Sequence, residues 1–162
     1  KELKGELHKE KESKINIHFS YSIDANYIKN TGERIALYRQ VLEAETFERL
    51  EEIRGELEDR CGRPPDSIEK IFFAGMVRVF AKANRLEEVD LYLDKLVLKL
   101  PDRGKGMQTL IEKIQRSGAV SEIKVIAETE RVWGFHFTDY KAFIREIAIL
   151  SHQDTKTPGH EE

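Results

Sequence analysis

DSIEKIFFAGMVRVFAKA, residues 66–83, is the most apolar helical pattern in the chain and decides the fold that we predict for it. Its apolar residues recur at intervals of three and four, which is the spacing of one helix face. Asp66 followed by Glu69 is typical of a capping box and predicts that the helix starts there. We therefore expect this segment to be the central helix, with a core face formed by Ile68, Ile71, Phe72, Met76, Val79 and Ala83.

Two amphipathic helices are predicted ahead of the central one. Thr31 is the predicted cap of the first, whose apolar stripe comprises Ile35, Tyr38, Val41 and Leu42. Thr46 is the predicted cap of the second, whose stripe comprises Phe47, Leu50, Ile53, Leu57 and the aliphatic stem of Arg54. Gly62 can adopt the left-handed conformation just beyond a helix end, and Pro64-Pro65 prevents continuation, so the second helix is expected to stop there.

After Asn84 the apolar period changes from 3.6 to 2, which predicts strands. A hairpin is expected with its turn at Asp94-Lys95, then a fourth helix that ends at Ser117-Gly118. Further strands are predicted around Ile15, Ile17 and Phe19, around Ile123 and Val125, and around Trp133, Phe135 and Phe137, with Thr138 capping a last helix. This order favours an α+β fold, in which a helical N-terminal half packs on a small, mainly antiparallel sheet with further helices.

The chain has 162 residues, the size of one domain. Residues 1–14 alternate Lys and Glu and are predicted to be the end of a linker helix, residues 15–150 to be the domain, and residues 151–162 to be a disordered tail. The lone Cys61 excludes an internal disulfide, and neither a secretory signal nor a membrane-spanning stretch is evident. A cytoplasmic protein is expected.

Motifs for catalysis or cofactor binding are missing from the sequence. Residues 103–109 come nearest to a phosphate loop, but they lack the four-residue spacing before Gly-Lys-Ser/Thr, so a plain strand-to-helix turn is favoured over a weak anion site. No His lies three or four residues from another His or from Cys61, as a local metal site requires. Trp133, Phe135 and Phe137 follow Arg131 and could stack bases, although their one-sided pattern favours the core. We predict no catalytic, cofactor-binding or metal-binding residue.

Charge is distributed unevenly along the chain. Residues 43–59 contain eight acidic residues against two basic ones, and residues 78–124 contain ten basic against seven acidic. Glu56 and Asp59 fall in the last turn of a predicted helix, where the helix dipole disfavours each anion by about 0.3–1 kcal/mol. Because they are three residues apart, they share a face and offer a two-carboxylate target for an arginine. Charge alone nevertheless favours a solvated surface.

A resemblance to a known family favours a binding role for these carboxylates over a solvated surface. Arg34-Ile35-Ala36-Leu37-Tyr38-Arg39, preceded by Tyr27-Ile28 and followed by Glu52-Ile53 and Glu56-Leu57-Glu58-Asp59-Arg60-Cys61-Gly62-Arg63-Pro64-Pro65, resembles the C-terminal domain of the bacterial transcription-repair coupling factors (Mfd). The family often has Pro-Asp where Lys29-Asn30 stands and an aromatic residue where Cys61 stands.

The resemblance implies a regulatory domain without catalytic activity. Its parent would be an ATP-dependent DNA translocase that displaces stalled RNA polymerase and recruits nucleotide excision repair, with ATP and Mg bound by the parent motor and no cofactor in this domain. The implied partner is a UvrB-like module of the same chain, whose UvrA-binding surface this domain would mask. UvrA, RNA polymerase and DNA would be reached indirectly through the parent.

Two hypotheses about surface residues follow. In the first, Glu56 and Asp59 dock on basic residues of the UvrB-like module, with Arg60 orienting them. In the alternative, the basic segment 78–124 contacts nucleic acid directly, through Arg78, Lys82, Lys99, Arg103 and Lys105. The resemblance makes the docking hypothesis the preferred one.

Overall fold

The computed structural model describes residues 12–100, 105–118, 120–126 and 132–146. The predicted linker over residues 1–14 therefore lies largely outside the described residues, and its last residue, Lys14, already begins a strand. The predicted tail over residues 151–162 lies outside them entirely.

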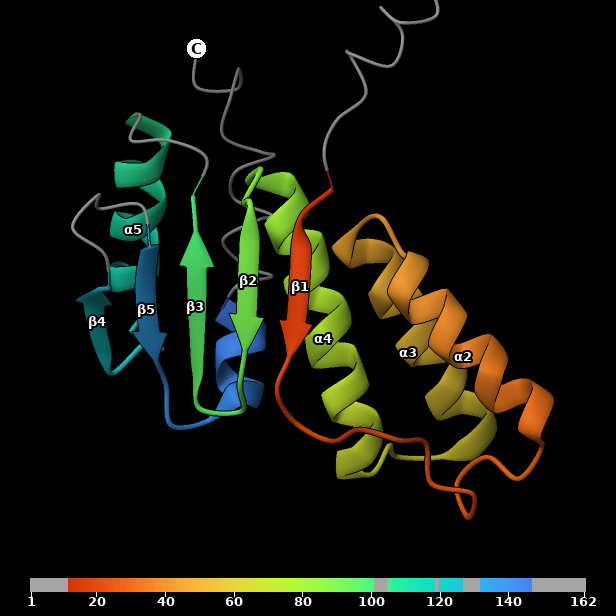
Figure 1. Ribbon diagram of the computed structural model, residues 1–162. Helices are drawn as coiled ribbons and strands as arrows, with labels where there is room; N and C mark the ends of the chain where they lie inside the picture. Colours follow the sequence, from red (N-terminus) through yellow and green to blue (C-terminus); the bar gives the residue numbers. More distant parts are fainter. Residues whose placement is uncertain (1–11, 101–104, 119, 127–131, 147–162) are drawn as a thin grey trace, which may run out of the picture.

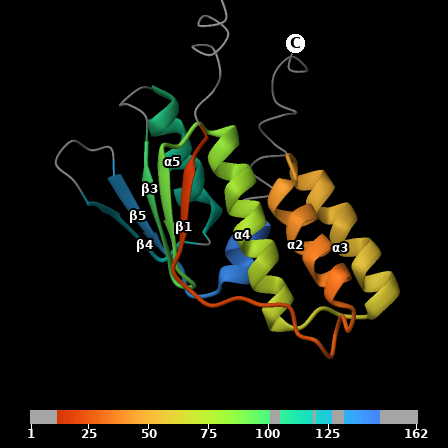
Figure 2. The same cartoon turned by 45° about the vertical axis from the view of Figure 1, so that its right-hand side comes forward.

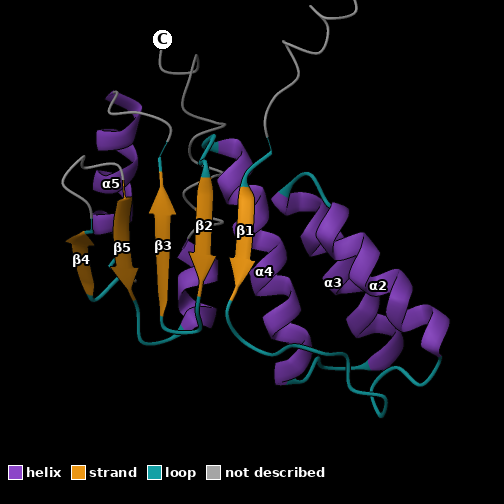
Figure 3. Ribbon diagram, viewed as in Figure 1, coloured by secondary structure: helices purple, strands orange, loops and turns teal. Residues whose placement is uncertain are grey.

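The described part combines one sheet with helices that cover one of its faces (Figures 1 and 2). The strand order is β1-β2-β3-β5-β4, as Figure 3 shows. The strands are β1 (Lys14–Ile17), β2 (Glu88–Leu91), β3 (Lys95–Lys99), β4 (Glu122–Val125) and β5 (Val132–His136). Only β1 and β2 pair in parallel, and the other three pairs are antiparallel. The predicted α+β class with a mainly antiparallel sheet is confirmed.

Helix α4 (Asp66–Ala83) is the central helix, as predicted. Every residue from 71 to 77 is buried, so the middle of this helix has no solvent face. The sheet lies on one side of α4, while α2 (Thr31–Glu43) and α3 (Phe47–Cys61) lie on the other (Figure 2). A helix that is apolar on all sides is stable in water only where other elements enclose it. The one exception to the predicted stripe is Ala83, which is exposed at the end of the helix.

Aromatic rings fill the space between α4 and the sheet. The Phe73 ring lies 6.0 Å from the Phe19 ring, 6.1 Å from the Phe137 ring and 5.0 Å from the Tyr140 ring. Phe135 and Phe137 are 0% and 2% exposed, which confirms the prediction that these aromatics belong to the core and not to a base-stacking surface. Such ring pairs contribute roughly 0.5–1.5 kcal/mol beyond the area they bury.

Three helix starts differ from the prediction. Asn30, and not Thr31, caps α2, because the Asn30 side chain accepts a hydrogen bond from the Glu33 amide at 3.0 Å. Helix α4 follows Pro65 without a side-chain cap, and the carboxylate of Asp66 binds Lys141 instead. The helix over residues 140–146 is capped by Asp139 in place of Thr138, through a 3.0 Å bond from the Lys141 amide. The predicted cap at Thr46 is confirmed.

The hairpin between β2 and β3 turns one residue earlier than predicted. Leu91 pairs with Leu96, and the Tyr92 amide donates to the Lys95 carbonyl at 3.0 Å. Leu93 and Asp94 are therefore the loop residues, so Leu93 is not part of a strand. The predicted fourth helix is α5 (Lys105–Ser117), and it ends at Ser117 as expected, with Gly118 at a φ of 77°.

Gly75 sets how closely α4 approaches α2 and α3. A Cβ atom at this position would lie 2.7 Å from Val41 Cγ1, 3.2 Å from the Val41 carbonyl oxygen and 3.3 Å from Leu50 Cδ2. Val41 is β-branched and cannot easily rotate away, so only glycine fits here. By contrast, a Cβ at Gly55 on α3 meets nothing within 4 Å.

These two glycines give a matched prediction. Gly75→Ala should lower the free energy of unfolding by about 1 kcal/mol, because overpacking costs about 1–3 kcal/mol and exceeds the roughly 1 kcal/mol that alanine gains in helix propensity. Gly55→Ala should raise it by about 0.5–1 kcal/mol, because only the propensity gain applies. Urea unfolding of both variants measures the difference, and equal effects of the two substitutions would contradict the packing argument.

Candidate functional site

Helix α3 presents its charged side outward. Phe47, Leu50, Ile53 and Leu57 are at most 6% exposed and face α4. Glu56 and Asp59 lie in the last turns of the same helix and are exposed. Among the residues that the structure describes, neither carboxylate has a hydrogen-bond or ion-pair partner. Both are therefore available to a partner without breaking a bond within the domain.

Arg60 does not hold these two carboxylates. Its Nη1 atom lies 3.9 Å from Oε1 of Glu33 on α2, and the two side chains are 62% and 58% exposed. An exposed pair at this distance contributes little to stability. The contact directs Arg60 toward α2 and not toward Glu56 or Asp59.

The end of α3 is tied to the loop before α2. Gly62 has a φ of 88°, which confirms the predicted positive-φ glycine, and its amide donates to the Glu58 carbonyl at 2.9 Å. The Tyr27 hydroxyl donates to the Gly62 carbonyl at 2.5 Å. Burial, followed by the nearby Cys61 and Glu58, raises the pKa of Tyr27 above its ordinary 10.0, so this hydroxyl stays protonated as a donor. The position of the last turn of α3 is thereby fixed.

Arg34 fixes the other end of the same loop. Its Nη1 atom donates to the carbonyls of Ile28 and Lys29 at 2.6 and 3.0 Å, and its Nη2 atom donates to Thr31 Oγ1 at 3.1 Å. This arginine therefore has a structural role in the conspicuous Arg34–Arg39 motif.

Ile35, in the same motif, points away from the core. It is 52% exposed, whereas Leu37 and Val41 are 5% and 0% exposed, so the predicted stripe of α2 was wrong at this position. At about 100° per residue, Ile35 lies about 160° around the helix from Leu37, and α4 can cover only one of the two.

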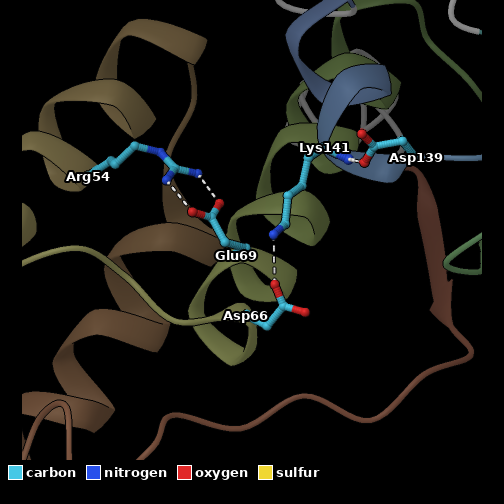
Figure 4. Close-up of polar contacts among 5 residues, drawn as sticks. All are labelled: Arg54, Asp66, Glu69, Asp139 and Lys141. Carbon is cyan, nitrogen blue, oxygen red and sulfur yellow. Dashed lines mark hydrogen bonds and ion pairs between the residues drawn. The ribbon is translucent and has the colours of Figure 1, made fainter.

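Arg54 fixes the rotation of α3 about its own axis. The sequence predicted only that its aliphatic stem joins the apolar stripe, and did not predict an ion pair. Its guanidinium makes two hydrogen bonds to Glu69 of α4, at 2.9 and 2.8 Å (Figure 4), and its Cζ atom lies 4.7 Å from the centre of the Phe72 ring. Burial by itself lowers the pKa of Arg54, but the bonds and charge of Glu69 outweigh it and raise that pKa. A bidentate pair is directional, so it aims the opposite side of α3 toward solvent.

The first turn of α4 also holds the helix over residues 140–146. Lys141 Nζ lies 2.7 Å from Asp66 Oδ1, as Figure 4 shows. The hydrogen bond and charge of Lys141 lower the pKa of Asp66, and the same bond raises the pKa of Lys141. One helical turn, with Asp66 and Glu69, thus connects three helices.

The residues of the alternative hypothesis are largely engaged within the domain. Arg78 Nη2 donates to the Ala44 carbonyl at 2.8 Å. Lys82 pairs with Glu45 at 2.7 Å, and Lys99 pairs with Glu87 at 3.5 Å. Arg103 lies outside the described residues, and of Lys105 the structure describes only its place at the start of α5. The acidic partners reduce the net positive charge that this segment can offer to phosphates.

Within the described ranges, no group of three or more His, Cys, Asp or Glu side chains is arranged to hold a metal ion. Within the same ranges, no helix has the length and apolar character to cross a membrane.

Comparison with known proteins shows a similarity to transcription-repair coupling factors. The family model described as the TRCF domain matches residues 17–111, more than half of the chain. The transcription-repair-coupling factor of Borreliella burgdorferi is 28% identical over 106 residues, and that of Bacillus subtilis is 26% identical over 95 residues. These alignments cover 65% and 59% of the chain but only 8% of each relative, so the chain matches a small part of much longer proteins.

A solved structure has the same fold. The crystal structure of the C-terminal domain of a transcription-repair coupling factor superposes with a TM-score of 0.60 at 18% identity, over 93% of this chain and 99% of that one.

The Arg54–Glu69 pair predicts a non-additive mutational effect. Arg54→Met should lower the free energy of unfolding by about 2 kcal/mol, because it leaves the largely buried Glu69 carboxylate without its partner. The double variant Arg54→Met, Glu69→Leu should recover most of that loss, since no buried charge is left unpaired. Chemical denaturation of the single and double variants measures this coupling, and additive losses would contradict the account.

The Asp66–Lys141 pair predicts a pH-dependent effect. Because Lys141 lowers the pKa of Asp66 below its ordinary 3.8, the pair stabilises the fold at neutral pH and loses this effect as the pH falls through the lowered pKa. Lys141→Met should therefore reduce the melting temperature at about pH 7, and this difference from the unmodified chain should shrink toward about pH 2. A difference that is independent of pH would show that Lys141 acts through packing alone.

Proposed function

The chain belongs to the TRCF domain family, and from that premise we propose that it is a regulatory docking domain, without catalytic activity, of a transcription-repair coupling factor. The parent protein is an ATP-dependent DNA translocase that acts in the cytoplasm, displaces stalled RNA polymerase and recruits nucleotide excision repair. In the resting parent, this domain covers the UvrA-binding surface of a UvrB-like module.

The carboxylate pair on α3 is the observation that supports this proposal. Glu56 and Asp59 are exposed, share one helix face and have no partner within the described part of the chain. Asp59 lies in the last turn of α3, where the helix dipole disfavours an anion by about 0.3–1 kcal/mol, and no hydrogen bond or ion pair among the described residues offsets this cost. A basic partner surface would offset it, and an arginine could bind a carboxylate through two parallel hydrogen bonds.

The surrounding structure makes the pair suitable for docking. Arg54 and Glu69 fix the rotation of α3, and the Tyr27–Gly62 bond fixes its end. A docking surface on a rigid helix loses little conformational entropy on binding. A contact within one chain can also be weak and still be closed most of the time, because the tether gives a high effective concentration.

Reversing the two charges tests the proposal. In a full-length transcription-repair coupling factor that carries this domain, Glu56→Arg with Asp59→Arg should open the docked state and raise UvrA affinity by about tenfold or more, because like charges then face each other across the contact. UvrA binding is measured by calorimetry or by a surface-based assay.

The control for this experiment has the same change in net charge. Glu12→Arg with Glu112→Arg alters two exposed acidic residues outside α3, and it should leave UvrA affinity unchanged. The thermal unfolding of both double variants shows whether the domain stays folded. Unchanged UvrA affinity in a folded Glu56→Arg, Asp59→Arg protein would refute the docking role.

A further inference from the structure

Strand β4 forms an edge of the sheet that is open in the described part of the chain (Figures 1 and 3). On its inner side it pairs with β5, where Lys124 lies opposite Gly134 and the Ile126 amide donates to the Val132 carbonyl at 2.8 Å. Successive residues of an antiparallel strand direct their backbone groups to opposite sides. The N–H and C=O groups of Ile123 and Val125 therefore point away from β5, to the open side.

Aliphatic side chains are exposed along this edge. Val125 is 49% exposed and Ile126 is 56% exposed, and with Ile35 they are the only large hydrophobic residues exposed among those described. Natural edge strands are commonly protected by charged side chains, especially lysine, by proline or by short length. Here the two charged residues, Glu122 and Lys124, balance each other at 3.5 Å.

The pattern of β4 is complementary to itself. When two copies pair antiparallel with Ile123 opposite its own counterpart, Glu122 lies opposite Lys124 of the partner subunit, and this happens twice by symmetry. The same register sets Val125 opposite the partner's Ser121, whose amide already donates to its own His136 carbonyl at 2.7 Å, so the ladder consists of the bonds between the two Ile123 residues. The outward-pointing backbone groups of Ile123 then meet those of the partner's Ile123, as an antiparallel ladder requires.

The neighbouring register is less favourable. A shift that keeps the ladder and sets Ile123 opposite the partner's Val125 brings the two Lys124 side chains face to face. Like charges directly opposite each other destabilise a strand pair. Charge therefore favours the first register over this one.

From these observations we propose that β4 is a self-association edge, through which two copies of this chain pair their β4 strands antiparallel and join their sheets into one. A short strand buries much less than the roughly 1,200–2,000 Å² of a standard stable interface. The dimer is accordingly weak, with a dissociation constant in the micromolar to millimolar range.

Sedimentation equilibrium over a concentration series of the whole chain tests the proposal. The unmodified chain should show a monomer–dimer equilibrium, and Val125→Lys should abolish it by placing an unpaired charge at the edge. Ile35→Lys is the matched control, because it makes the same type of change at an exposed aliphatic residue of α2 and should leave the equilibrium unaltered.

Charge exchange tests the register. Glu122→Lys and Lys124→Glu should each raise the dissociation constant by about tenfold, since each sets like charges opposite each other. The double variant Glu122→Lys, Lys124→Glu should restore dimerisation, and an equimolar mixture of the two single variants should form a heterodimer.

Three outcomes would overturn the proposal. These are a chain that stays monomeric up to millimolar concentration, a double variant that fails to restore what the single variants lose, and an Ile35→Lys chain that dissociates as the Val125→Lys chain does. Circular dichroism of each variant establishes that the fold is retained.

Discussion

The burial of α4 between the sheet and the pair α2 and α3 is the constraint on which the rest of the structure depends. Every residue from 71 to 77 is buried, so each side of the helix needs a neighbour of its own. Phe73 meets the sheet side through Phe19 and Phe137, and Gly75 meets Val41 and Leu50 on the other side. Because the core extends through this one helix, a change in its packing is felt in both layers.

Ion pairs made by the first turn of α4 orient the two helices that they bind. Asp66 and Glu69 lie one turn apart, and they bind Lys141 and Arg54 on two different helices. The apolar stripe of α3 decides which side of the helix faces α4, and the directional Arg54–Glu69 pair fixes that rotation more closely. Glu56 and Asp59 point outward as a consequence of contacts in which they take no part.

The two surfaces proposed for interaction lie at opposite ends of the molecule. Helix α3 is at one end and β4 is at the other, in both views of the ribbon (Figures 1 and 2). Their chemistry also differs, because α3 presents unpaired carboxylates and β4 presents a backbone edge with exposed aliphatic side chains. Occupation of one surface therefore leaves the other accessible.

The sequence by itself determined the features that depend on local interactions. It predicted the central helix, the cap at Thr46, the positive-φ glycine at residue 62 and the mainly antiparallel α+β class, because each follows from spacing or from backbone preferences within a few residues. The tertiary structure decided what depends on distant partners. Asp66 binds Lys141 instead of capping α4, and Arg60 pairs with Glu33. Leu37, and not Ile35, is buried on the side of α2 that faces α4. The tertiary structure also decided the parallel pairing of β1 with β2 and the place of β4 at the edge of the sheet. No local pattern could specify these contacts, because the residues that meet are far apart in the sequence. Where a side chain has several possible partners of similar chemistry, the packing of the whole chain decides which of them lies within reach.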